Sequence, residues 1–143
     1  MHRKLIFVCL FAMILAALAV PAMADPGRGA NVLCYVWSHN SSPAIGVPFQ
    51  PSSTYSYNAQ SRSGGNSVTR TAVGQYTVTC RSVGGGVAWG AGGHVQVTAY
   101  GGDADYCKVV SWVTGGPDFS ATVRCYNPAG ALSDNQFDLL FVW

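Results

Sequence analysis

The chain has 143 residues, of which 49 % are hydrophobic and only 10 % are charged, and its formal net charge is +2. The high apolar and aromatic content excludes a disordered chain. The shortage of basic residues argues against nucleic acid or an anionic membrane surface as a partner, because both depend on neutralising many negative charges.

The first segment has the three parts of a secretory signal peptide. Residues 2–4 are basic, residues 5–20 are apolar, and small residues end at Ala24. An apolar run of this length is short for a membrane span, which needs about 20 residues. We therefore expect a signal peptide at 1–24, cleaved after Ala24, and a single secreted β-domain at 25–143. Removing two basic residues leaves six against six aspartates, so the net charge of that domain is zero.

After the signal peptide, strand patterns are plentiful and helix patterns are nearly absent. In chain order, the segments with alternating or β-branched character are residues 31–38, 52–58, 66–72, 74–82, 94–100, 106–113, 119–126 and 137–143. Turn residues separate them at short intervals, which is typical of sandwiches and small barrels. The sequence therefore predicts an all-β fold, an antiparallel β-sandwich or small barrel of about 7–9 strands.

Four cysteines remain in the secreted domain: Cys34, Cys80, Cys107 and Cys125. An even number in an exported chain indicates two disulfides. Zinc is the alternative, but the cysteines lack the close spacing of a metal knuckle. Four cysteines allow three connectivities, so a further argument is needed to choose among them.

Strand register supplies that argument if residues 114–118 form a five-residue hairpin loop. The facing pairs are then Val113–Phe119, Val109–Val123 and Cys107–Cys125. Directly opposed residues on antiparallel strands can come close enough for a disulfide. Cys34 then pairs with Cys80 by elimination.

A second hairpin is expected around the turn at 101–105. It would place Tyr100 opposite Tyr106, Ala99 opposite Cys107 and Val97 opposite Val109. Asp103 and Asp105 are then solvated turn residues, since calcium requires six to eight oxygen ligands. The sequence predicts neither a metal site nor a cofactor.

The hairpin model predicts a possible binding face opposite the core. Its residues are Tyr100, Tyr106, Lys108 and Trp112, with Trp89 contributed by the glycine-rich segment 84–93. Exposed aromatics beside polar side chains can hold a sugar ring or a partner protein. The alternative is that a loop or a second sheet covers this face, and we expect Trp112 to be half covered by the segment 84–93.

Catalytic motifs are missing from the sequence. It contains no glutamate, no G-x-S-x-G and no H-E-x-x-H. His39 and His94 lie at predicted strand ends, and the aspartates lie in predicted turns or loops except Asp138, in the last strand. We expect a protein that is not an enzyme.

Five segments together carry a resemblance to a known group of proteins. They are YVWSHNSS (35–42), NSVTRTAVGQYTV (66–78), VQVTAYG (95–101), CKVVSW (107–112) and VRCYNPAGALSDNQFDLLF (123–141). The chain resembles an uncharacterised family of secreted bacterial β-rich domains over most of its mature length. The family pattern includes the Cys107 and Cys125 pair, but it implies no activity, catalytic residue or ligand.

These observations predict a secreted, disulfide-stabilised β-domain that acts as a non-catalytic binding or structural module. One alternative is a carbohydrate-binding module that uses exposed aromatics. Another is a small protease inhibitor or effector, suggested by the proline-rich loop 39–53 and the glycine-rich loop. The expected partner is a glycan or an extracellular protein, with no nucleic acid and no membrane after signal cleavage.

Overall fold

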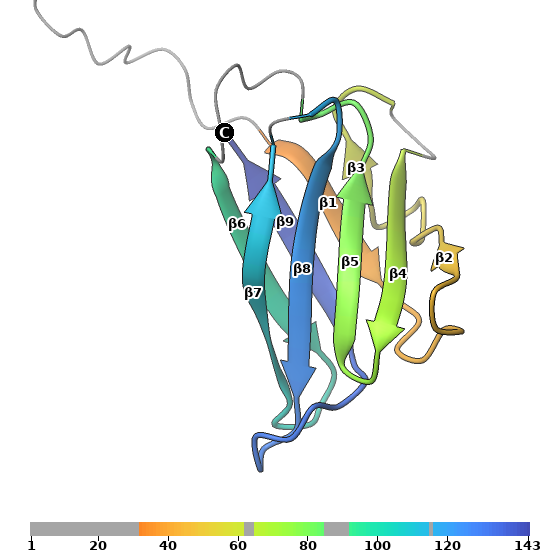
Figure 1. The fold of residues 1–143 in the computed structure, drawn as a ribbon, viewed down its shortest axis with the longest axis vertical. Coiled ribbons are helices and arrows are strands. Elements are labelled where there is room, and N and C mark those ends of the chain that lie inside the picture. The colour runs from red at the N-terminus through yellow and green to blue at the C-terminus, as the bar shows by residue number, and fades with distance from the viewer. Residues whose placement is uncertain (1–31, 62–64, 85–91, 115) are drawn as a thin grey trace, which may run out of the picture.

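The computed structural model describes residues 32–61, 65–84, 92–114 and 116–143, which form two antiparallel sheets packed face to face (Figure 1). The strands are β1 (Val32–Ser38), β2 (Pro48–Phe49), β3 (Tyr57–Asn58), β4 (Asn66–Ala72), β5 (Gln75–Cys80), β6 (His94–Tyr100), β7 (Tyr106–Val113), β8 (Phe119–Tyr126) and β9 (Gln136–Val142). The four-stranded sheet has the order β3-β1-β9-β6, and the five-stranded sheet has the order β2-β4-β5-β8-β7. The predicted all-β sandwich is confirmed.

Two of the predicted features lie outside the described residues, namely the signal peptide at 1–24 and Trp89. Within the described ranges, the chain contains no helix that is long and apolar enough to cross a membrane.

The core lies between the two sheets and is built by strict alternation along the strands. On β5, β8 and β9, every second side chain is buried, and the residues between them are more exposed. Phe119 of β8 stacks on Phe141 of β9 with 4.1 Å between ring centroids, and Tyr76 of β5 meets Phe137 of β9 at 5.2 Å. Each such buried side chain contributes about 1.5–3 kcal/mol, so these contacts hold the sheets together.

Two disulfides crosslink the sandwich in different ways. Cys34–Cys80 joins β1 to β5 and therefore connects the two sheets. Cys107–Cys125 joins directly opposed residues of β7 and β8 within the five-stranded sheet. Both predicted pairings are confirmed. We refer to Cys34–Cys80 as the inter-sheet disulfide.

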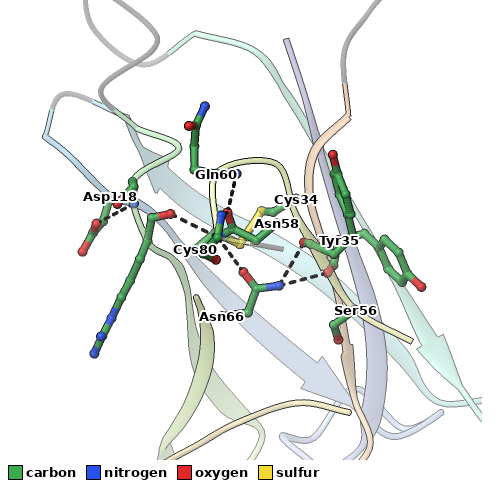
Figure 2. Close-up of a disulfide and its surroundings, with 12 residues drawn as sticks. Cys34, Tyr35, Ser56, Asn58, Gln60, Asn66, Cys80 and Asp118 are labelled. Atoms are coloured by element: carbon green, nitrogen blue, oxygen red, sulfur yellow. Dashed lines mark hydrogen bonds between the residues drawn. A yellow bond between two sulfur atoms is a disulfide. The ribbon is translucent and has the colours of Figure 1, made fainter. Parts of the chain in front are cut away.

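A pair of buried asparagines lies beside the inter-sheet disulfide (Figure 2). The Asn58 Nδ2 donates to Asn66 Oδ1 at 3.0 Å and to the Arg81 carbonyl at 3.1 Å. The Asn66 Nδ2 donates to the carbonyls of Tyr35 at 3.3 Å and Tyr57 at 3.0 Å. Because Asn58 belongs to β3 and Asn66 to β4, the amide pair joins the two sheets with satisfied hydrogen bonds.

The predicted β7–β8 register is confirmed in its first half and wrong in its second. Tyr106, Cys107, Lys108 and Val109 face Tyr126, Cys125, Arg124 and Val123, as the hairpin predicted. A bulge between Val109 and Ser111 then adds one residue, so that Val113 faces Ser120 instead of Phe119. A bulge reverses the side to which all later side chains point. Trp112 consequently turns toward the core.

The predicted hairpin between β6 and β7 is also wrong. The β6 strand pairs with β9, with Val97 opposite Leu139, whereas β7 pairs with β8. The two strands lie side by side at one edge of the sandwich but in different sheets (Figure 1). The connection 101–105 crosses between the sheets, and Gly101 adopts a φ of 148°, which side chains strongly disfavour. The inward residues of β6, and those of β7 up to Val109, are as predicted, because both arrangements give the same alternation.

A carboxylate pins three loops at one end of the sandwich. Asp134, between β8 and β9, forms an ion pair with Arg70 and accepts the Gly74 N–H at 2.8 Å. It also accepts the hydroxyls of Tyr76 and Ser42, each at 3.2 Å. Burial opposes ionisation, but the hydrogen bonds from Arg70 and Gly74 outweigh it and lower the pKa of Asp134. Burial, the largest cause, raises the pKa of Tyr76 to about 12.

We expect Asp134→Asn to reduce the free energy of unfolding at pH 7 by about 2 kcal/mol, because it leaves a partly buried guanidinium without its charged partner. Since the folded pKa of Asp134 is depressed, its contribution is complete above the ordinary value of 3.8 and is lost as the pH falls through the lower folded value. Urea denaturation across the acid range should therefore show a flatter pH dependence in the variant. Asp103→Asn, in the exposed turn, is the control. Superimposable acid limbs for Asp134→Asn and the wild type would contradict this role.

The two disulfides should differ in their contribution to stability. The inter-sheet disulfide closes a separation of 46 residues and the other a separation of 18. In the loop-entropy model, these correspond to about 4 and about 3 kcal/mol. We compare, by denaturation, the two double variants in which both cysteines of one disulfide are replaced by alanine. The variant Cys34→Ala with Cys80→Ala should lose more free energy of unfolding, because it also removes the covalent link between the two sheets. A larger loss for the Cys107 and Cys125 pair would contradict this ranking.

Candidate functional site

The structure distributes the residues of the predicted binding face over separate surfaces. Tyr100 lies on the outer face of the four-stranded sheet, whereas Tyr106 and Lys108 lie on the outer face of the five-stranded sheet. Trp112 points inward, and Trp89 lies outside the described residues. The shared face depended on a β6–β7 hairpin in one sheet, which does not form.

Tyr106 and Lys108 form a closed cluster with a neighbour on β8. The Tyr106 ring stacks on Tyr126 with 5.2 Å between centroids, and the Lys108 Nζ lies 4.8 Å from the Tyr126 centroid. Arg124 lies opposite Lys108, as the register predicted. The aromatic faces here are used by each other and by a lysine, so this cluster is less suited to holding a ligand.

Trp112 packs against the core and is not part of an exposed face. Its ring is half-buried and packs against the core, and its Nε1 donates to the Gly92 carbonyl at 3.2 Å. Gly92, from the segment 84–93, thus contacts the half-buried Trp112 ring as expected, but the contact lies on the core side of the sheet. Trp112 therefore contributes to packing at the edge of the sandwich.

The turn aspartates lie in the crossover between β6 and β7. Asp105 accepts a hydrogen bond from the Asn135 Nδ2 at 3.0 Å, and Asp103 is exposed. Within the described ranges, no three or more His, Cys, Asp or Glu side chains converge as a metal site would need. His94 is exposed at the start of β6.

An aromatic pocket lies on the outer face of the four-stranded sheet. It has a volume of about 320 Å³ and is lined by Trp37, Tyr55, Tyr100 and Asp138. Trp37 points outward because its neighbours on β1, Val36 and Ser38, are buried. Asp138 lies directly opposite Trp37 on β9. Tyr100 ends β6 on the other side of β9, and Tyr55 comes from the loop before β3.

The rings of this pocket stand at steep angles to one another. Trp37 and Tyr55 are 5.0 Å apart with an interplanar angle of 88°, and Trp37 and Tyr100 are 5.6 Å apart at 68°. Tyr55 and Tyr100 remain 56 % and 53 % exposed, so the pocket opens to solvent. The rings form walls around a space instead of one flat platform.

Asp138 is electrostatically isolated. Partial burial raises the pKa of its carboxyl group. Among the described residues, neither a hydrogen bond nor an ion pair reaches this carboxylate. The strands of the four-stranded sheet contain no lysine or arginine, so Asp138 is their sole formally charged side chain. The Asp138 side chain is exposed, and the partial desolvation of its carboxylate is not offset by a counter-charge among the described residues.

Hydrogen bonds hold the first wall of the pocket in place. The backbone N–H of Trp37 donates to Ser56 Oγ at 3.1 Å, and this bond connects β1 to the loop that carries Tyr55. His39 lies 5.8 Å from the Trp37 ring, and its Nδ1 accepts the Ser52 N–H at 3.2 Å. This bond fixes the side of the His39 ring that faces the loop before β3. The Trp37 Nε1 is buried without a partner among the described residues.

Sequence reasoning did not identify Trp37, Tyr55 and Asp138 as site residues. A signal was present for two of them. Trp37 alternates with residues of an inward face, and Asp138 is a lone charge in an otherwise apolar strand. Their proximity was not visible, because it depends on β9 inserting between β1 and β6.

The two environments predict different effects of truncation. We expect Trp112→Ala to reduce the free energy of unfolding by about 3 kcal/mol, since it removes a large half-buried ring from the core edge. Tyr106→Ala removes a ring that is 45 % exposed and should cost about 1 kcal/mol or less. Urea denaturation of both variants measures the difference. Equal losses would contradict the inward orientation of Trp112.

Comparisons of the chain with models of protein families, with curated proteins and with solved structures found no match.

Proposed function

We propose that this chain is an exported, disulfide-bonded binding module without catalytic activity, and that its ligand site is the aromatic pocket formed by Trp37, Tyr55, Tyr100 and Asp138. The observation that carries the proposal is the combination of three aromatic walls and an unpaired carboxylate around an open volume of about 320 Å³. Ligand sites of small molecules typically begin at about 300 Å³ and combine apolar walls with few polar groups.

Two features support binding as the role of this pocket. Two of its three rings, Tyr55 and Tyr100, are exposed to water on the side of the sheet that faces away from the core. Its carboxylate carries a desolvation cost that no partner in the described part of the chain offsets. Groups with such costs are concentrated at functional sites.

Export is supported by the sequence of residues 1–24 and by two disulfides, which persist in oxidising compartments. The resemblance to secreted bacterial β-rich domains remains a prediction. It implies neither an activity nor a ligand, so the proposal rests on the pocket itself.

Glycan binding is the second candidate. The outer face beside the pocket carries Gln96 and Thr98 on β6, which point outward next to Tyr100. Amide and hydroxyl groups beside aromatic rings are suited to sugar hydroxyls and ring faces. The geometry favours it less, because the rings stand at steep angles and a sugar ring stacks on a flat face.

The proposal is tested by removing one wall of the pocket. We expect Tyr100→Ala to reduce the free energy of unfolding by less than about 1 kcal/mol, because the ring is exposed, and to abolish ligand binding. Binding is followed by the indole N–H signal of Trp37 in NMR titrations with cellohexaose, chitohexaose and choline. Tyr106→Ala is the matched control, since it removes a similarly exposed tyrosine from the other sheet.

At least one of the three probes should shift the Trp37 signal in the wild type and in Tyr106→Ala, and none should shift it in Tyr100→Ala. A lack of response to all three probes would sink the proposal, as would equal loss in both variants.

A further inference from the structure

We infer that the aromatic pocket binds the head of an organic cation, a quaternary or methylated ammonium group. This inference rests on the proposed function and specifies its ligand class. The residues that carry it are Trp37, Tyr55, Tyr100 and Asp138, which line the pocket together.

The arrangement of the rings is the first argument. Trp37 stands at 88° to Tyr55 and at 68° to Tyr100, with centroids 5.0 and 5.6 Å apart. Rings at these angles offer walls to a compact, roughly spherical group from several directions. The face of an aromatic ring is its negative pole, so a cation close to the rings is attracted to each face. Tryptophan gives the strongest attraction of this kind.

The carboxylate is the second argument. Asp138 projects from the middle strand of the sheet, opposite Trp37 on one side and Thr98 on the other. No described residue supplies it with a positive charge, and the strands around it contain no lysine or arginine. A ligand cation would supply the missing charge in a place where water is partly excluded, and the interaction is stronger there than on an open surface.

The neighbours of the pocket do not compete for this role. Of the groups around Asp138, Tyr55 and Tyr100 are pocket walls, and His39, beside Trp37, is not among the lining residues and is hydrogen-bonded to the Ser52 N–H. Lys108, by contrast, lies over Tyr126 on the other sheet. That cluster is an internal example of a cation over an aromatic ring, whereas the aromatic pocket has the rings without the cation.

The type of cation follows from the ligand set. A metal ion needs several oxygen ligands, and the pocket provides one carboxylate with two phenol groups. A primary ammonium is a compact, strongly hydrated charge that would pair with the carboxylate and phenol oxygens and make little use of the ring surfaces. A methylated ammonium has a spread charge and an apolar surface, which suits the ring faces. The pocket is open on one side, so the remainder of the ligand can extend into solvent.

The test compares choline with its neutral isostere, 3,3-dimethylbutan-1-ol, in which a carbon replaces the nitrogen. Both are titrated into the folded domain at matched ionic strength, and the Trp37 indole signal is followed by NMR. We expect the alcohol to bind about tenfold more weakly or not at all, because the two probes have the same shape and differ in charge. Equal binding would mean that the pocket recognises an apolar shape, and it would overturn the cation assignment.

Asp138→Asn tests the carboxylate separately. The variant keeps the shape of the side chain and should reduce choline affinity about tenfold while leaving binding of the alcohol unchanged. Burial disfavours the charged form of Asp138, so the variant should keep the thermal midpoint of the wild type or raise it. Unchanged choline affinity in this folded variant would overturn the role of Asp138.

The outcomes separate this inference from the proposed function. If an oligosaccharide binds at Trp37 and choline does not, the binding module stands and the cation assignment fails. If neither choline nor an oligosaccharide gives a response at Trp37, both fail. Tyr106→Ala, on the opposite face, should retain the choline response in full, and its loss there would place the cation at the other tyrosine cluster.

Discussion

The connection between the two sheets beside Cys34 and Cys80 is the constraint on which the rest of the structure depends. Each sheet has one apolar face, and neither can hide it from water alone. The inter-sheet disulfide holds β1 against β5, and the Asn58–Asn66 pair adds directional hydrogen bonds next to it (Figure 2). The covalent bond limits the distance between the sheets, and the amides determine how they lie against each other.

The outer surface follows from this inner constraint. Because Cys34 and Val36 point into the sandwich, strand alternation directs Trp37 outward. The same rule on β9 buries Phe137 and Leu139 and exposes Asp138 between them. The antiparallel register of β1 with β9 then sets Trp37 opposite Asp138. The ring and the carboxylate of the pocket therefore have positions that are determined by the packing of the core behind them.

The two outer faces of the sandwich differ in whether their charged side chains have interaction partners. On the five-stranded sheet, Lys108 lies over the ring of Tyr126, and at one end Arg70 pairs with Asp134. On the four-stranded sheet, Asp138 has no such neighbour among the residues that the structure describes. A protein that exposes aromatic rings and leaves a carboxylate unpaired in one place accepts a local cost in stability. Such local inconsistencies in an otherwise well-satisfied fold are typical of binding sites. This contrast is the reason for proposing a binding site on that face.

The sequence by itself determined the seven long strands, the inward residues of β7 up to its bulge, and the two disulfide pairings. These follow from local rules, since alternation shows which side chains are buried and opposed cysteines show one register. The sequence was wrong about β2, which lies in the predicted loop 39–53, and about the predicted strand 52–58, of which only Tyr57–Asn58 is a strand. Only the tertiary structure decided that β6 pairs with β9, that the bulge after Val109 turns Trp112 inward, and that Trp37, Tyr100 and Asp138 meet. The alternation of a strand is the same whichever strand it pairs with. The choice of the neighbouring strand depends on how two whole sheets bury their apolar faces, and the sequence of a single strand does not reveal it.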